Sequence, residues 1–164
     1  MTELAGELVR LRPAVQGDVS ELAAIRATPE VYARWGDGDV AEGLADPDCQ
    51  VLAVEFGGRV VGAIQWSAEK DPDYRHAGID IYLSPAVHGR GLGADAVRTL
   101  ARHLIDVVGH HRLVIDPAAD NRAAIRCYAK VGFRPVGVMR QYERSPDGTW
   151  HDGLLMDLLA GELT

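Results

Sequence analysis

A cluster of three glycines marks the most informative segment of the sequence. Residues 83–94 read Leu-Ser-Pro-Ala-Val-His-Gly-Arg-Gly-Leu-Gly-Ala, with glycines at Gly89, Gly91 and Gly93 between a strand-like and a helix-like stretch. Glycine lets a backbone approach a ligand closely, and the unpaired N–H groups at a helix N-terminus attract phosphate. Because Arg90 adds a further anion ligand, the segment favours an anion site over a turn that binds nothing.

Two other phosphate-binding loops are alternatives for this segment. Gly89-x-Gly91-x-x-Ala94 matches a dinucleotide fingerprint, and Asp116 follows at about the right distance to bind a ribose hydroxyl. A dinucleotide fold needs several strand–helix–strand units, whereas this sequence indicates one, and it would leave the first half of the chain unexplained. A Walker loop does not fit, because no Gly-Lys-Ser/Thr follows the glycines.

Two aspartates lie where a parallel sheet would bind a ligand. In the strand 77–83, Ile79, Ile81 and Leu83 share one face and leave Asp80 on the other. A sheet covered by helices favours apolar residues on both faces, so Asp80 indicates a site, although a solvated strand aspartate fits about equally well. Asp116 follows the apolar strand 113–115, at the strand end where ligands gather, but Asp-Pro also commonly ends a strand.

A predicted helix over residues 120–130, capped by Asp120, carries two further candidates. Asn121 and Tyr128 are seven residues apart and therefore lie on one helix face. On spacing alone, Tyr128 is more typical of a core aromatic than of a catalytic group.

Two segments together resemble the GNAT acyltransferases. His88-Gly89-Arg90-Gly91-Leu92-Gly93 resembles the pyrophosphate loop of that family, with His88 where Gln or Arg is usual. Residues 121–133, Asn-Arg-Ala-Ala-Ile-Arg-Cys-Tyr-Ala-Lys-Val-Gly-Phe, resemble its second signature, and the order of elements agrees over nearly the whole chain.

Shorter matches resemble the aminoglycoside 6′-N-acetyltransferases within the family. They are Gly78-Ile79-Asp80, Asp116-Pro117, the run 124–128, Pro146-Asp147-Gly148, the loop's Gly-Leu-Gly and Trp35-Gly36. The longer, tryptophan-rich insertion that such enzymes can carry before the fourth strand is lacking here. The amino-terminal strand and the Trp35 region are also similar to ribosomal-protein N-terminal acetyltransferases.

The resemblance implies acetyl-CoA as co-substrate, no metal, and direct transfer to an amine in a ternary complex. It implies that the Leu83 N–H stabilises the oxyanion, that Asn121 binds pantetheine and that Tyr128 protonates the leaving thiolate. Asp80 would bind the reacting amine and act as its base or only position it. The implied cofactor-binding set is Leu83, His88, Gly89, Arg90, Gly91, Leu92, Gly93, Ala94, Asn121 and Tyr128, and the implied substrate-binding set is Trp35, Gln65, Asp80, Asp116 and Asp147.

The acceptor implied first is a small polycationic amine, the 6′-amino group of an aminoglycoside. The alternatives are a protein N-terminus of the ribosomal-protein type, a lysine-like amine in siderophore synthesis, and a CoA-binding sensor without catalysis. We expect Asp80, Asp116 and Asp147 to meet in one cleft that attracts a polycation.

Strands and helices must position these residues. The predicted strands are at 8–12, 50–56, 59–67, 77–83, 113–115, 133–144 and 149–159. The predicted helical segments begin at residue 18 and lie at 29–35, 39–44, 91–108 and 120–130. One strand–helix–strand crossover makes a single parallel pair, and hairpins make the other pairs antiparallel. The prediction is an α/β fold of the GNAT type over a single domain, 1–164. Its sheet is mixed and mostly antiparallel, with seven strands, one parallel splayed pair and about four helices.

Composition restricts the partners. The 164 residues include 17 Lys and Arg against 24 Asp and Glu, a formal net charge of −7. This balance lacks the basic footprint expected for a nucleic acid or an anionic membrane. The sequence has no apolar run long enough to span a bilayer and no signal-peptide pattern. Cys49 and Cys127 lack metal-ligand spacing, which predicts reduced thiols in a cytoplasmic protein. We expect a monomer or a homodimer.

Overall fold

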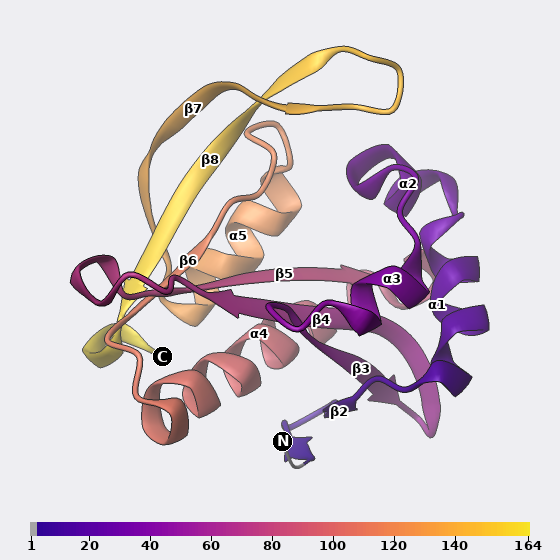
Figure 1. Cartoon of the computed structure of the whole chain (residues 1–164), viewed down its shortest axis with the longest axis horizontal. Helices are drawn as coiled ribbons and strands as arrows, with labels where there is room; N and C mark the ends of the chain where they lie inside the picture. The colour runs from indigo at the N-terminus through magenta and orange to yellow at the C-terminus, as the bar shows by residue number, and fades with distance from the viewer. Residues whose placement is uncertain (1–2) are drawn as a thin grey trace.

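Eight strands form one mixed sheet in the computed structural model, which describes residues 3–164 (Figure 1). Their order across the sheet is β1-β2-β3-β4-β5-β6-β8-β7. The strands are β1 Leu4–Ala5, β2 Arg10–Pro13, β3 Gln50–Phe56, β4 Arg59–Ala68, β5 Ala77–Leu83, β6 Arg112–Ile115, β7 Arg134–Arg144 and β8 Trp150–Leu159. The predicted sheet type is confirmed. The strand missing from the prediction is β1, whose two residues are too few to show an alternating pattern.

Helices cover both faces of the sheet. On one face, α1 Val19–Arg26, α2 Pro29–Trp35 and α3 Val40–Ala45 enclose a small buried cluster around Leu22 and Tyr82. On the other face, α4 Leu92–His103 and α5 Arg122–Val131 contribute to the main core. The helix predicted to run to residue 108 ends at His103 and continues as a π-helical turn, Leu104–Val108. In Figure 1, α4 lies below the sheet, and α2 stands opposite the tip of the β7–β8 hairpin.

The parallel strands β5 and β6 separate soon after they begin. They pair only at Ala77↔Leu113 and Gly78↔Val114, whereas β5 stays paired with β4 as far as Leu83. The Ser84 N–H donates to the Val61 carbonyl across β4 (2.7 Å). Because successive residues of an antiparallel strand alternate in direction, the Leu83 N–H faces the opposite side, where β6 has diverged.

The start of α5 differs from the predicted cap. Asn121, rather than Asp120, is the N-cap residue, and its Oδ1 accepts a hydrogen bond from the Ala124 N–H (3.2 Å). Asp120 lies one residue too early for this geometry. It forms an ion pair with Arg34 of α2 instead (2.8 Å), and so links α2 to the loop before α5.

A large bulge bends β7. The register passes from Met139↔Gly153 to Glu143↔His151, so the three residues 140–142 lie opposite a single residue of β8. Within the bulge Gln141 has a φ of 48°, and its N–H donates to Asp152 Oδ1 (2.8 Å). Such bulges redirect the side chains that follow, and here they redirect Tyr142 and Glu143.

The buried carboxylate of Asp95 holds the start of α4 in place. Asp95 is 5% exposed and accepts hydrogen bonds from the N–H groups of residues 7, 8 and 9, at 3.0, 2.8 and 2.9 Å. Hydrogen bonds to a carboxylate are stronger than those between neutral groups. They attach the segment before β2 to the first turn of α4, directly after the glycine loop.

Replacing this carboxylate will destabilise the fold. We expect Asp95→Ala to lower the free energy of unfolding by about 3 kcal/mol, because it leaves the buried Val9 N–H and the part-buried N–H groups of Glu7 and Leu8 without a partner. Urea unfolding followed by circular dichroism measures the change. Asp106→Ala, at an exposed position, is the control and stays within about 0.5 kcal/mol of the wild type. Equal stability of the two variants would contradict this role for Asp95.

Candidate functional site

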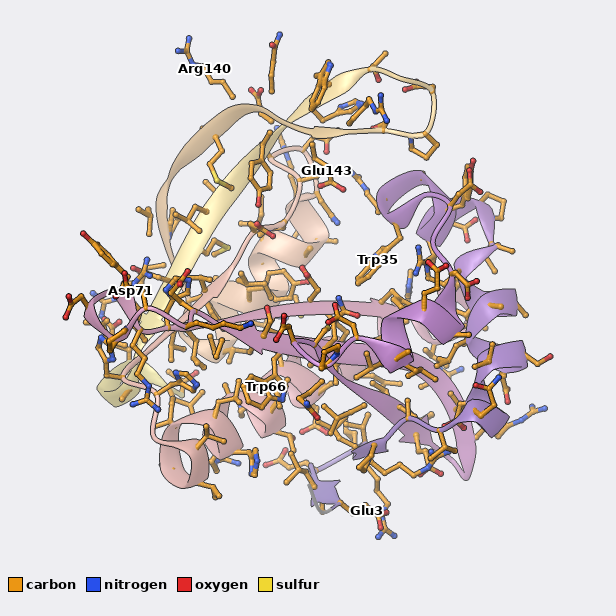
Figure 2. The ribbon with its side chains drawn as sticks, viewed as in Figure 1. Glu3, Trp35, Trp66, Asp71, Arg140 and Glu143 are labelled. Carbon is orange, nitrogen blue, oxygen red and sulfur yellow. The ribbon has the colours of Figure 1, made fainter. Side chains whose placement is uncertain are left out.

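Two cavities meet at Tyr128. The first, of about 530 Å³, extends along the glycine loop and the start of α5. The second, of about 570 Å³, lies where β5 and β6 have separated, with α2 and β7 at its sides. Figure 2 shows Trp35 of α2 and Glu143 of β7 on facing sides of this second region. The residues that line both cavities are Arg34, Trp35, Ile81, Asn121, Ala124 and Tyr128.

The glycine loop forms one wall of the first cavity. The predicted residues that line it are Leu83, His88, Gly89, Gly91, Leu92, Gly93 and Ala94, whereas Arg90 is exposed and outside the lining. Gly91 is the N-cap of α4 and has a φ of 79°, in the left-handed region that favours glycine. The His88 ring nitrogen Nε2 lies 3.0 Å from the Leu83 carbonyl oxygen. His88 therefore closes the loop onto the end of β5.

The α5 residues face the junction of the cavities. Tyr128 is 8% exposed, and its hydroxyl has no hydrogen-bond partner within residues 3–164. Burial raises the pKa of Tyr128 above its ordinary value, so the phenol stays protonated and can donate. Asn121 uses Oδ1 to cap the helix, which leaves its amide N–H groups available to donate in the cavities that it lines. The predicted pair does lie on one side of α5.

Asp80 lies in the second cavity with a perturbed ionisation. Burial, and then the nearby charges of Asp116 and Glu143, raise the pKa of Asp80 to about 7. The Asp80 side chain is accessible to solvent within the cavity. Because the cavity walls surround it, fewer water molecules solvate its carboxylate than the accessible area suggests, and burial therefore raises the pKa. A carboxyl that titrates near neutral pH can accept a proton from an amine.

Asp116 shares this cavity with Asp80, as predicted, and it has a partner that the sequence did not reveal. The Tyr142 hydroxyl donates to Asp116 Oδ2 at 2.7 Å, and this hydrogen bond is the main reason that the pKa of Tyr142 rises to about 12. Glu143 also lines the cavity, and burial followed by the charge of Asp116 raises its pKa.

The other predicted substrate residues are divided among the cavities. Trp35 lines both main cavities and packs edge-on against Tyr82, with ring centroids 4.8 Å apart. Gln65 pairs with Asp80 across β4 and β5 and lines a smaller cavity of about 200 Å³ that Asp80 and Asp116 also line.

Asp147 does not join the other two aspartates. It lines a separate outer cavity of about 840 Å³, and its carboxylate accepts hydrogen bonds from the Thr149 N–H and hydroxyl (3.0 and 2.6 Å). These bonds hold the pKa of Asp147 below its ordinary value. The expected cleft of three aspartates therefore holds two of them, because the β7–β8 turn carries Asp147 past the cavity that Asp80 and Asp116 line.

Several residues that line the cavities were not assigned to the site from the sequence, among them Arg34, Cys127, Tyr142 and Glu143. Cys127 of α5 packs against Gly93 of α4. A Cβ at position 93 would lie 3.4 Å from the Cys127 sulfur, so the absence of a side chain at Gly93 lets the two helices approach closely. For Tyr142 and Glu143 the only signal was a polar, aromatic run before the Ser-Pro-Asp-Gly turn, and its direction depends on the bulge.

Two further properties concern residues 3–164 alone. Within this range no three His, Cys, Asp or Glu side chains are grouped so as to hold a metal ion. The helices in the same range are all too short or too polar to cross a bilayer.

The ionisation of Asp80 gives a prediction that needs no substrate. We expect carbon NMR of the free protein to show the Asp80 carboxyl titrating near pH 7, and Asp116→Asn to lower that pKa because it removes a like charge.

Since the folded-state pKa of Asp80 exceeds the ordinary value of 3.8, its contribution to the free energy of unfolding falls as pH rises through about 7. Asp80→Asn will lack this fall, whereas the exposed control Asp106→Asn will keep it. Titration of Asp80 near pH 4 would contradict the assignment.

Comparison with known proteins agrees with this geometry. Residues 20–133 match the model of the acetyltransferase (GNAT) family. The chain is 30% identical to the aminoglycoside N(6′)-acetyltransferase type 1 of Klebsiella pneumoniae, over 88% of this chain and 81% of that protein. It is 32% identical to the N-alpha-acetyltransferase RimI of Mycobacterium tuberculosis, over 67% of this chain and 68% of that protein.

A solved structure extends the comparison to three dimensions. AAC(6′)-Ib in complex with paromomycin and acetyl-CoA aligns with a TM-score of 0.78 at 26% identity, covering 95% of this chain and 97% of that one. A family match across residues 20–133, with identity to named N-acetyltransferases along most of the chain, shows that this protein is an acetyltransferase of the GNAT family.

Proposed function

We propose that this protein transfers the acetyl group of acetyl-CoA directly to an amine of an aminoglycoside, at the 6′ position. The observation that carries the proposal is the junction of two cavities at Tyr128, with the glycine loop on one side and Asp80 on the other. A donor and an acceptor held in these cavities would meet next to a protonated phenol and a carboxyl that titrates near neutral pH.

The first cavity suits acetyl-CoA. The backbone N–H groups at the start of α4 would bind the pyrophosphate, and the Asn121 amide would donate to pantetheine. Because β6 has diverged, the Leu83 N–H would be free to stabilise the oxyanion at the thioester carbonyl. Cys49 and Cys127 are both free thiols, which fits the cytoplasm as the proposed place of the reaction.

In the proposed reaction an amide bond forms and the thioester carbon–sulfur bond breaks, and one proton is transferred before this exchange and one after it. The ammonium group gives a proton to the Asp80 carboxylate, and the neutral amine attacks the thioester carbon. The tetrahedral intermediate then collapses to the amide as the carbon–sulfur bond breaks. Tyr128 donates its proton to the departing thiolate and regains one from solvent, while Asp80 releases the proton it received. A raised phenol pKa keeps this donor protonated before the bond breaks.

The second cavity suits a cationic acceptor. Asp80, Asp116 and Glu143 bring three carboxylates to its lining within a chain of net charge −7, and such a field attracts polycations. Trp35 would form an apolar wall, Gln65 would support Asp80 across the sheet, and Asp147 would contact a distant ring in the outer cavity. The identity to aminoglycoside 6′-acetyltransferases supports this acceptor. The identity to RimI makes a protein N-terminus the second candidate.

Substitution in the glycine loop tests whether the loop binds acetyl-CoA. We expect Gly91→Val to raise the KM for acetyl-CoA at least about tenfold, because a branched side chain blocks the backbone's approach to the pyrophosphate. Gly109→Val is the matched control, since Gly109 also has a positive φ, of 91°, but lies beyond the other end of α4 with open space around its Cα. If both variants bind acetyl-CoA as the wild type does, the loop does not hold the donor.

The acceptor is tested by steady-state kinetics with kanamycin and with a peptide that begins with Ala or Ser. We expect efficient turnover of kanamycin, with a KM that rises with salt because exposed charges are screened beyond about 8–10 Å.

Tyr128→Phe should lower kcat about 100-fold with little change in acetyl-CoA binding. Turnover of the peptide but not of kanamycin would replace the proposed function with N-terminal acetylation. If no amine releases CoA from acetyl-CoA, the protein is a CoA-binding sensor.

A further inference from the structure

The bulge in β7 brings Glu143 to the junction of two acceptor-side cavities. Glu143 lines the 570 Å³ cavity that holds Asp80 and also the 840 Å³ outer cavity beneath the β7–β8 turn. Besides Glu143, the described residues that line both are Arg34 and Ala118. An acceptor that extends from Asp80 toward the outer cavity would therefore pass the Glu143 carboxylate.

The charges around this junction are not equally available to a ligand. Arg34 is paired with Asp120 at 2.8 Å, and Asp116 accepts the Tyr142 hydrogen bond at 2.7 Å. Within residues 3–164, the side chains of Asp80 and Glu143 form no hydrogen bond or ion pair, although the charges of Arg34 and His151 act on Glu143 from nearby. Two carboxylates in the acceptor cavity are thus left to bind cationic groups.

A separate observation indicates where the reacting group of the acceptor lies. Tyr128 is 8% exposed as a residue, its hydroxyl forms no hydrogen bond within residues 3–164, and the side chain lines the same cavity. Since it faces both the donor cavity and Asp80, the reacting amine belongs at Asp80. This leaves Glu143 for a different part of the acceptor molecule.

We propose that Glu143 binds a second ammonium group of the acceptor, so that the enzyme prefers amines with at least two positive charges to amines with one. The proposal rests on the proposed function for the reacting amine at Asp80. Tyr142 is a positioning residue here, because its hydrogen bond holds Asp116 in place beside the bulge that presents Glu143. Binding of a cation would also relieve the mutual repulsion of the clustered carboxylates.

A matched pair of acceptors isolates the second charge. 1,5-Diaminopentane and 1-aminopentane share a carbon chain and differ by one ammonium group, and kanamycin serves as a larger polycation. With saturating acetyl-CoA, we expect Glu143→Gln to lower kcat/KM at least tenfold for the diamine and for kanamycin, and less than twofold for the monoamine. Glu21→Gln, which removes the same charge from an exposed position on α1, should change none of the three.

The outcomes separate this inference from the proposed function. An equal loss with the diamine and the monoamine, or no loss with either, overturns the role of Glu143. Acetylation of the diamine but not of kanamycin, with the expected Glu143→Gln effect, leaves Glu143 in its role and rejects the aminoglycoside. Acetylation of kanamycin at an undiminished rate by Glu143→Gln keeps the proposed function and rejects the role of Glu143.

If the wild type acetylates neither small amine, calorimetry with CoA present decides. Binding of the diamine at least tenfold weaker to Glu143→Gln than to the wild type supports the inference, and equal binding, or none to either protein, overturns it.

Discussion

The separation of β5 from β6 is the constraint on which the site depends. A parallel pair that stayed together would satisfy its backbone groups in the ladder and leave no space between the strands. Here pairing ends at Gly78 and Val114, while β4 keeps β5 in place as far as Leu83. The Leu83 N–H is thereby freed from the ladder, and a space opens at the strand ends. Both cavities lie around this opening.

Separate elements reach the opening from different directions, and each is fixed by its own interaction. The Asp95 carboxylate secures the start of α4, and the Asn121 cap starts α5. The β7 bulge, held by the bond from Gln141 to Asp152, brings in Tyr142 and Glu143. Because each element is fixed by a hydrogen bond of its own, the site can keep its shape although it lies between elements rather than on one of them.

Bringing several carboxylates to one cavity is electrostatically unfavourable for folding. Burial, followed by the nearby charge of Asp116, raises the pKa of Asp80, and the same two causes raise the pKa of the more exposed Glu143. Clustered like charges of this kind oppose folding. They persist where they serve a function, and the cationic acceptor proposed for this cavity would supply the missing counter-charge. The hydrogen bond from Tyr142 relieves Asp116 in part.

The residues proposed to bind the donor could be singled out from the sequence, because they are neighbours along the chain. Local backbone geometry indicates the glycine loop, and helix periodicity places Asn121 and Tyr128 on one face of α5. The resemblance to the GNAT signatures singled out these residues, and the order of strands and helices determined the fold type. The acceptor half was decided by tertiary structure. The sequence indicated Asp80 and Asp116, but it missed Glu143 and Tyr142 and grouped Asp147 with the wrong cavity. Their placement depends on an irregular register between β7 and β8, and a bulge leaves no periodic signal in the sequence.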